Sequence, residues 1–537
     1  MILRLIAAAA LAVLAHPATA QEIPSIVSKD GKHMLTVDGA PFLMLGAQAN
    51  NSSNYPSQLP MVWPVLERMH ANTLEMPIAW EQVEPVEGKF DFSFLDTLVE
   101  QARAHKMRVV LLWFATWKNT GNSYAPDWVK RDIQRFPRMR KPDGTAHYAL
   151  SPHGRNTLEA DKRAFVAMMK HLARIDRDNT VIMVQPQNEA GSYGLNRDHA
   201  PEADRLFKGA VPAELIKALG KKPGSWTEVF GKRAEQFFQT WYLARYIEEI
   251  AAAGKAVKPL PMYVNAALGD AFSDEGGNVG PSGGPNWNVI PVWKAAAPHI
   301  DLAAPDIYNR DPAAVIAFLD KYARADNPLM VPEIGNARDY GRFLWPALGH
   351  GTIGFAPFGM DDTGFFNYPL GAKEFDAATF AAFAEPYRLL KPMAGDWAKI
   401  AFENPTWGTA KGAPEQSRTM GRWKLGAEYG LWQMGEPGWT SWLKIDPRPD
   451  VDAPVGGMVA AQIGPDTFLI AGSHVRVRVG LATPAPGEQA QVIRAEEGSF
   501  VGGKWVTSRL WNGDQIDYGY NFTDRPVMLR VTMGNYR

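Results

Sequence analysis

The chain has 537 residues, of which 46% are hydrophobic and 21% charged, and its formal net charge is −1 at pH 7. This composition is typical of a folded globular protein, and the length predicts more than one domain. The balanced charge gives no electrostatic reason to expect nucleic acid or an acidic membrane surface as a partner. Because the chain contains no cysteine, disulfides, a thiolate nucleophile and a cysteine-ligated metal are excluded.

Residues Met1–Ala20 have the pattern of a secretory signal peptide. Arg4 precedes an apolar run, and the segment ends in a small-residue A-x-A cleavage pattern. The apolar run is short for a bilayer span, and no later segment reaches the roughly 18 apolar residues that a spanning helix needs. We therefore expect an exported protein that begins near Gln21 and has no membrane segment after cleavage. Export without disulfides favours the periplasm.

Strand-like and helix-like segments alternate over residues 21–390. Between the strands, apolar residues recur at helical spacing, and one long helix is expected over Trp226–Ala253. Eight strands that are apolar on both faces and separated by helices predict a parallel (β/α)8 TIM barrel. An open doubly wound sheet is less favoured, because no glycine-rich turn follows the first strand. The expected strands are Pro41–Ala47, Asn72–Trp80, Arg108–Phe114, Thr180–Gln185, Met262–Asn265, Ile300–Tyr308, Pro328–Glu333 and Thr352–Phe358.

The pattern changes near residue 390. Residues 391–537 contain short strands separated by turns, including the pair Gly502-Gly503, and predict a smaller all-β, sandwich-like accessory domain. Within the barrel, two long insertions over Lys118–Arg155 and Asp270–Trp293 follow the third and fifth strands. Loops of this length at a barrel rim usually shape a cleft.

Two glutamates follow strands of the expected barrel. Glu189 comes directly after the fourth strand, and Glu333 ends the seventh. The carboxyl ends of barrel strands meet at one rim, so both side chains should face one pocket. Two carboxylates on either side of a sugar ring are the requirement for cleaving a glycosidic bond, and about 5 Å between them indicates retention of configuration. We expect Glu189 to be the general acid/base and Glu333 the nucleophile.

Further candidates for substrate binding lie at neighbouring strand ends. Asn188 could hydrogen-bond a sugar 2-hydroxyl, and Tyr308 could hold Glu333 in position. Some of these positions have an equally plausible structural role in capping loops or packing under the first insertion. The adjacent acids Asp361 and Asp362 form an alternative pair, but neighbouring residues cannot easily face each other across a substrate. The other candidate contacts are Gln48, Glu81, Trp113, Trp117 and Asn119.

The motifs around these residues resemble clan A of the glycoside hydrolases. The run NEAGSYG, which begins at Asn188, is similar to the NEYGSYG of family 35 β-galactosidases. The stretch from Trp80 to Phe92 matches the W-x-x-x-E-P-x-x-G-x-F-D-F pattern of that family. The C-A-E-W motif of the family is absent, and residues 115–119 read ATWKN instead. The run APDW at 125–128 resembles family 42, which also contains β-galactosidases.

The resemblance implies a retaining, exo-acting β-galactosidase from the divergent bacterial branch with one C-terminal β domain. Its substrates would be terminal β-galactosyl groups of oligosaccharides or polysaccharides, such as plant xyloglucan fragments. The alternatives are a family 42-like enzyme, an endo-acting β-glucanase or mannanase, and a non-catalytic saccharide-binding barrel. No metal or cofactor is expected, because the 11 histidines form no H-E-x-x-H or similarly spaced ligand set. The sequence leaves the oligomeric state open.

Overall fold

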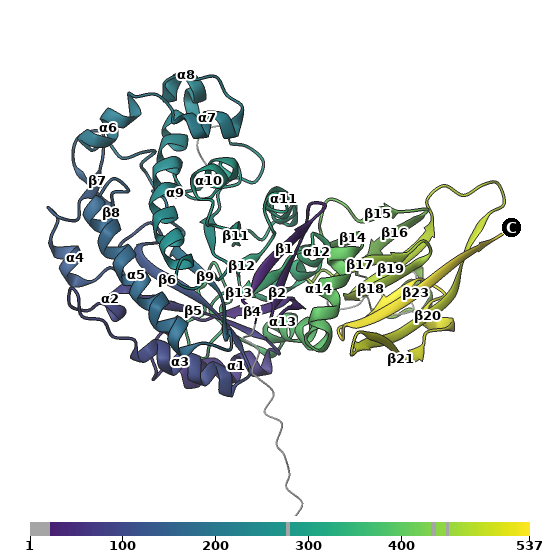
Figure 1. The fold of residues 1–537 in the computed structure, drawn as a ribbon. Helices are drawn as coiled ribbons and strands as arrows, with labels where there is room; N and C mark the ends of the chain where they lie inside the picture. The colour runs from purple at the N-terminus through teal and green to yellow at the C-terminus, as the bar shows by residue number, and fades with distance from the viewer. Residues whose placement is uncertain (1–21, 275–279, 431–436, 447–450) are drawn as a thin grey trace, which may run out of the picture.

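The computed structural model describes residues 22–274, 280–430, 437–446 and 451–537. The expected signal peptide and part of the second insertion lie outside these residues. Among the described helices, none is both long and apolar enough to cross a bilayer. Figure 1 shows an α/β body that contains the first two thirds of the chain and a β-rich body that contains the C-terminus.

Eight parallel strands form the centre of the first body, which confirms the predicted barrel. They pair in the order β10-β11-β12-β13-β4-β5-β6-β9, and a parallel bridge between Val184 and Met262 joins the two ends. Every residue of β4, β5 and β9 is buried, because one face lines the barrel and the other packs on helices. The strands are β4 (Met44–Gln48), β5 (Thr73–Ala79), β6 (Arg108–Lys118), β9 (Val181–Asn188), β10 (Tyr263–Ala267), β11 (Leu302–Ile307), β12 (Val331–Ile334) and β13 (Gly354–Pro357).

Helices surround the barrel (Figure 1). Their apolar faces recur at the expected spacing; in the third helix Leu95, Leu98, Val99 and Ala102 are all buried. The main helices are α1 (Leu59–Arg68), α3 (Ser93–Ala104), α5 (Arg155–Ile175), α9 (Ala234–Lys255), α10 (Ile290–Ala296), α11 (Pro312–Tyr322), α12 (Leu344–Gly349) and α13 (Ala377–Leu390). Shorter helices are α2 (Trp80–Val83), α4 (Asp127–Arg131), α6 (Pro201–Phe207), α7 (Ala213–Leu219) and α8 (Trp226–Phe230).

The single helix expected over Trp226–Ala253 is wrong. The structure has α8, then a 3-10 turn at Gly231–Arg233, and then α9. Gly231 follows the last residue of α8 with φ of +56°, a conformation that ends an α-helix and that glycine adopts without strain. Phe230 and Phe237 still stack across the break, with ring centres 4.4 Å apart. The apolar spacing is therefore maintained although the helix is interrupted.

The first expected strand is also divided. Its first residues belong to a small antiparallel sheet of β1 (Ser25–Lys29), β2 (Lys32–Val37) and β3 (Ala40–Phe42), and the rest form β4. Leu35 and Val37 of β2 share a buried cluster with barrel-lining residues such as Val110 and Met183. This small sheet therefore closes one end of the barrel and leaves the strand carboxyl ends at the other.

The C-terminal body is a sandwich of two antiparallel sheets, as expected. One sheet has the order β14-β17-β18-β23-β20-β21 and the other β15-β16-β19-β22. Buried residues from both sheets, including Trp407, Trp423, Phe468 and Val477, share one core. The strands are β14 (Thr406–Ala410), β15 (Ser417–Met420), β16 (Trp423–Glu428), β17 (Gly457–Gly464), β18 (Thr467–Ser473), β19 (Val475–Leu481), β20 (Gln489–Val501), β21 (Lys504–Leu510), β22 (Tyr520–Phe522) and β23 (Val527–Tyr536), with a short helix α15 (Pro437–Leu443).

The two bodies are in close contact. The helix α14 (Ala394–Glu403) follows residue 390 and packs against β2 and β3, so the first sandwich strand begins only at Thr406. A Cβ atom on Gly349 of α12 would lie 2.1 Å from the backbone nitrogen of Gly408, so the helix and β14 meet where neither residue has a side chain. The division of the chain at residue 390 stays a prediction.

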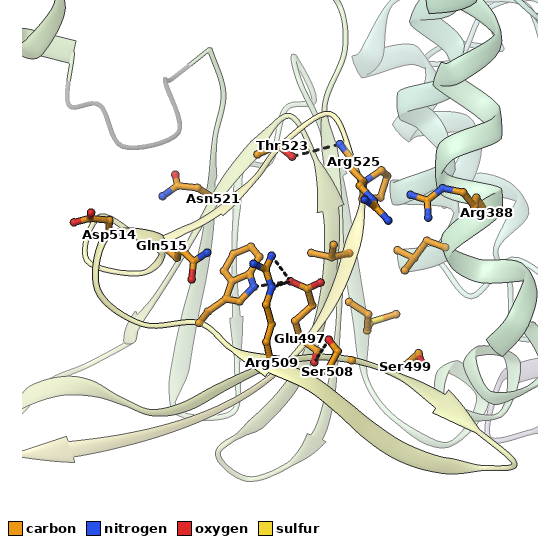
Figure 2. Close-up of a pocket in the computed structure, with 16 residues that line it drawn as sticks. Arg388, Glu497, Ser499, Ser508, Arg509, Asp514, Gln515, Asn521, Thr523 and Arg525 are labelled. Carbon is orange, nitrogen blue, oxygen red and sulfur yellow. Dashed lines mark hydrogen bonds and ion pairs between the residues drawn. The ribbon is translucent and has the colours of Figure 1, made fainter.

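A pocket of about 800 Å³ lies where α13 meets the sandwich, and we call it the junction pocket (Figure 2). Its wall contains Glu497, whose Oε2 accepts hydrogen bonds from Nε of Arg509 at 2.8 Å and from the indole of Trp511 at 2.7 Å. Figure 2 also shows Arg388 of α13 on the opposite side. Oε2 of Glu497 is therefore paired within the sandwich.

Candidate active site

Glu189 and Glu333 lie together at the carboxyl ends of the barrel strands. Glu189 is the residue after β9, and Glu333 is the third residue of β12. Asp306 of β11 joins them, because it pairs directly with Glu333 in the register of β11 and β12. One oxygen from each of the three carboxyl groups lies within 4.8 Å of the other two. We call these three residues the carboxylate cluster.

Both oxygens of Glu333 accept hydrogen bonds from neighbouring side chains. The hydroxyl of Tyr308 donates to Oε1, and Nε2 of Gln48 donates to Oε2 at 3.2 Å. The backbone carbonyl of Tyr308 in turn accepts a hydrogen bond from the hydroxyl of Tyr340 at 2.6 Å. Burial and the adjacent Glu333 raise the pKa of Tyr308 well above its ordinary value, so this hydroxyl remains a donor. The Glu333 carboxylate is therefore held in one orientation.

Glu189 has a different environment. Burial raises its pKa to about 7, and the charge of Glu333 contributes in the same direction, while Lys118 opposes the rise. The backbone of Glu189 has φ of +44°, a left-handed conformation that is strained for a residue with a Cβ atom. Its N–H donates to Oδ1 of Asn265 at 2.9 Å, and its carbonyl accepts from the N–H of Thr120 at 3.3 Å. Backbone contacts with Asn265 and Thr120 thus fix a residue whose carboxyl group is protonated in part of the molecules at pH 7.

Asp306 was present in an expected strand but was not among the predicted contacts. Its Oδ2 accepts a hydrogen bond from Nδ2 of Asn265 at 2.6 Å, and a side-chain hydrogen bond joins its carboxyl group to that of Glu189. Burial, Glu333 and Glu189 together raise the pKa of Asp306 well above its ordinary value. The sequence could have indicated this position of Asp306, because side chains alternate along a strand and residues 306 and 308, two positions apart, face the same side.

Asn188 is completely buried and interacts with a lysine that the sequence did not suggest. Nζ of Lys118 donates to Oδ1 of Asn188 at 2.8 Å, and the two residues pair in the register of β6 and β9. Nδ2 of Asn188 is buried without a hydrogen-bond partner. The two N–H bonds of the Asn188 amide, beside Glu189, are therefore not accepted by any described group of the protein.

Glu81 and Asn119 lie at a second part of the rim. They line a pocket of about 580 Å³ together with Lys118 and residues from the loops after β4 and β6, such as Tyr124 and Tyr148. Oε2 of Glu81 forms an ion pair with Nζ of Lys130 at 2.9 Å. Since Lys118 contacts Asn188 and also lines this rim pocket, the pocket begins beside the carboxylate cluster.

Trp113 and Trp117 do not line the site, which corrects their predicted role. Both are completely buried on the face of β6 that packs on helices. The indole N–H of Trp113 donates to Oδ1 of Asp161 in α5 at 2.8 Å, and the ring of Trp117 packs against Tyr246 of α9 with centres 4.6 Å apart. The prediction failed because β6 is apolar on both faces, so its alternation does not reveal which residues face the barrel interior.

The alternative acid pair has a structural role. Asp361 accepts hydrogen bonds from the backbone N–H of Asn50 at 2.8 Å and from the hydroxyl of Ser53 at 2.8 Å, which ties β13 to the loop after β4. Asp362 is exposed. Asp361 is therefore held by a loop contact and does not face Asp362 across a cleft. The three oxygens of the carboxylate cluster are also close enough to hold a metal ion, so the expectation of a metal-free site stays a prediction.

Comparisons with known proteins point in the same direction. The family model for glycoside hydrolase family 42, described as β-galactosidase, matches residues 63–256, and a model for a domain of unknown function (DUF5597) matches residues 383–523. The first match contains Glu189 and Lys118 and ends before Glu333. It supports a clan A glycoside hydrolase of the β-galactosidase type. The matching model is that of family 42, and the expected membership of family 35 is not shown.

Individual relatives match over short regions. β-Galactosidase BgaA of a Thermus species is 25% identical over 163 residues, which are 28% of this chain and 23% of the relative. A β-galactosidase of Thermus thermophilus is 25% identical over 170 residues, 29% of this chain and 24% of the relative. The chain thus spans about a quarter of the length of these curated relatives. Among solved structures, a β-galactosidase from Marinomonas ef1 has a TM-score of 0.48 at 14% identity, covering 67% of this chain and 62% of that one.

Proposed function

We propose that the protein is a retaining glycoside hydrolase that releases terminal β-linked galactose. The main observation is the separation of the carboxyl oxygens of Glu189 and Glu333, which is within 4.8 Å. Retaining enzymes have carboxyl groups about 5 Å apart, whereas inverting enzymes leave roughly 6.5–9.5 Å for a water molecule. The different environments of the two glutamates support different roles in the reaction.

In the first step, the protonated carboxyl of Glu189 gives its proton to the glycosidic oxygen as the bond to the anomeric carbon breaks. An oxygen of Glu333 attacks that carbon and forms a covalent ester, and the aglycone leaves as an alcohol. In the second step, the ionised Glu189 takes a proton from a water molecule. The oxygen of this water attacks the anomeric carbon and releases Glu333, which restores both carboxyl groups.

The side chains around the two glutamates fit these two reaction steps. Tyr308 and Gln48 orient the nucleophile, and the unpaired Nδ2 of Asn188 is available to a hydroxyl of the bound sugar. The rim pocket lined by Glu81 and Asn119 provides room for further sugar contacts. That the released residue is a terminal one rests on the resemblance to exo-acting β-galactosidases.

Galactose as the released sugar rests on the resemblance to β-galactosidases. The family 42 match fits this proposal at least as well as the motif resemblance to family 35. As a finer proposal, the substrates are terminal β-galactosyl groups of plant-type oligosaccharides such as xyloglucan fragments, processed in the periplasm after export.

A mechanism-based inhibitor tests the proposal. Incubation with a 2-deoxy-2-fluoro-β-galactosyl fluoride should stop turnover of an aryl β-galactoside and label one peptide, identified by mass spectrometry as that containing Glu333. Labelling elsewhere would contradict the assignment of the nucleophile. A panel of aryl glycosides gives the control for the sugar, since an endo-acting glucanase or mannanase should barely hydrolyse an aryl β-galactoside.

A further inference from the structure

Lys118 is a buried cation in an unusual position. Its exposed fraction is 5%, and it stands in the segment that replaces the C-A-E-W motif. Its ammonium donates hydrogen bonds to Oδ1 of Asn188 at 2.8 Å and to Oδ1 of Asn119 at 2.5 Å, and the ring centre of Phe114 lies 5.0 Å from Nζ. In the described part of the chain it forms no ion pair with a carboxylate. Burying an ammonium group without a direct counterion costs free energy, which indicates that Lys118 has a functional role.

The backbone holds Lys118 in place through a strained turn. Lys118 and Gly121 exchange both backbone hydrogen bonds, at 2.8 and 3.0 Å, around a two-residue turn. The central residues Asn119 and Thr120 have φ of +49° and +64°, and this conformation is unfavourable for a β-branched residue such as threonine. The N–H of Thr120 donates to the carbonyl of Glu189 at 3.3 Å. The turn thus joins the lysine directly to the strand end that contains Glu189.

The ammonium determines the orientation of the Asn188 amide. Because Nζ has only donors, it must face the oxygen of the amide, and the reversed rotamer would place an NH2 group against the ammonium. Among the described residues, Nδ2 then has no hydrogen-bond partner. A donor pair fixed in this way is suited to a sugar hydroxyl adjacent to the anomeric carbon, whose hydrogen bonds strengthen in the transition state.

The same ammonium acts on the carboxylate cluster. Lys118 lowers the pKa of both Glu189 and Asp306 through its charge. Burial raises both, and Glu333 adds to the rise. The charged and titratable groups that face Glu189 come from several elements. They are Lys118 of β6, Asp306 of β11, Tyr308 directly after β11, Glu333 of β12 and Tyr193 of the loop after β9.

We propose that Lys118 is a positioning residue for the reaction: its ammonium directs Nδ2 of Asn188 toward the bound sugar and balances part of the negative charge of the carboxylate cluster. The role of Lys118 in directing Asn188 toward the sugar rests on the proposed function. Its role in balancing the charge of the carboxylate cluster does not depend on the substrate.

A double-mutant cycle tests the role of Lys118 in directing Asn188. Lys118→Met should lower kcat/KM for an aryl β-galactoside by about 10²-fold, which is the effect of losing one preorganised donor. The kcat/KM for the 2-deoxy analogue, which lacks the hydroxyl, should change by less than about threefold. In an Asn188→Ala background the same substitution should add little, because both changes remove one interaction. Equal losses on the two substrates, or losses that simply add, would overturn the proposal. Lys162→Met in α5, whose lysine pairs with Glu159 and Glu249, is the matched control and should behave like the wild type.

A titration without substrate tests the role of Lys118 in balancing charge and separates it from failure of the proposed function. In protein labelled with ¹³C at glutamate carboxyl groups, the signal of Glu189 is assigned with Glu189→Gln. Lys118→Met should move its midpoint to higher pH, since a stabilising cation is lost, and Lys162→Met should leave it in place. An unchanged midpoint in Lys118→Met overturns the proposal. If the wild type hydrolyses no galactoside, the proposed function fails, while this titration still decides the role of Lys118.

Discussion

At the barrel rim, Glu189, Asp306 and Glu333 crowd together with Lys118 nearby, whereas in the junction pocket Glu497 is paired directly with Arg509 (Figure 2). Both sites place acids in a concave, partly buried setting. At the rim, desolvation and the charge of Glu333 raise the pKa of Glu189 and of Asp306. In the junction pocket, a guanidinium and an indole satisfy the acid. The difference separates a site suited to proton transfer from one whose acid is paired within the sandwich.

The largest expected effect is that of Glu333→Ala, which removes the proposed nucleophile. We expect kcat/KM for aryl β-galactosides to fall by at least about 10⁴-fold, as for other nucleophiles in covalent catalysis. Added azide should restore turnover by occupying the vacated space and attacking the anomeric carbon. Unchanged turnover, or no rescue by azide in a folded protein, would mean that the rim acids do not act as proposed.

The position of Glu333 illustrates what the sequence could predict. A strand followed by a glutamate is a local pattern, and the carboxyl ends of barrel strands necessarily share a rim, so Glu189, Glu333 and Tyr308 were placed together from sequence alone. Trp113 and Trp117 were misplaced because both faces of β6 are apolar. Lys118 was missed because its role depends on the register of β6 and β9 and on Asn188, which is 70 residues away.

The second largest effect is that of Glu189→Ala, and it should depend on the leaving group. Substrates with poor leaving groups need the proton and should slow by about 10²–10⁴-fold, while those with good leaving groups need it little in the first step. Kinetics of kcat/KM across a series of aryl galactosides should therefore give a steeper dependence on leaving-group pKa than in the wild type. Equal slowing across the series would contradict the role of acid.

The pH dependence of kcat/KM gives a second test of Glu189 as the acid of the rim site. Glu189 must be protonated to donate, and burial raises its pKa to about 7, so wild-type kcat/KM should fall as the pH rises through about 7. Glu189→Ala with a good leaving group should lose this alkaline decline, because no acid remains to titrate. Rate measurements from pH 5 to 9 provide the check, and a decline that persists in the variant would assign it to another group.

A smaller effect is expected for Tyr308→Phe, which removes the hydroxyl that donates to Oε1 of Glu333. Gln48 still donates to Oε2, so the carboxylate should remain close to its place but less well held. We expect kcat to fall by about 10²-fold, with a smaller change in KM, because the interaction positions the nucleophile for attack. The paired variant Tyr340→Phe, which loses only the bond to the carbonyl of Tyr308, should cost less.

The smallest effect on catalysis should come from the junction pocket. Glu497→Ala leaves the indole N–H of Trp511 and the guanidinium of Arg509 without their acceptor, and Trp511 is only 5% exposed. Leaving a buried donor unpaired costs about 1–3 kcal/mol, so thermal unfolding should move to lower temperature. Turnover of an aryl galactoside below the unfolding range should remain within about twofold of the wild type, since surface and structural contacts far from the chemistry do not alter the transition state. A large loss of turnover in the folded variant would show that the two acidic sites are functionally coupled, and the contrast between them would no longer hold.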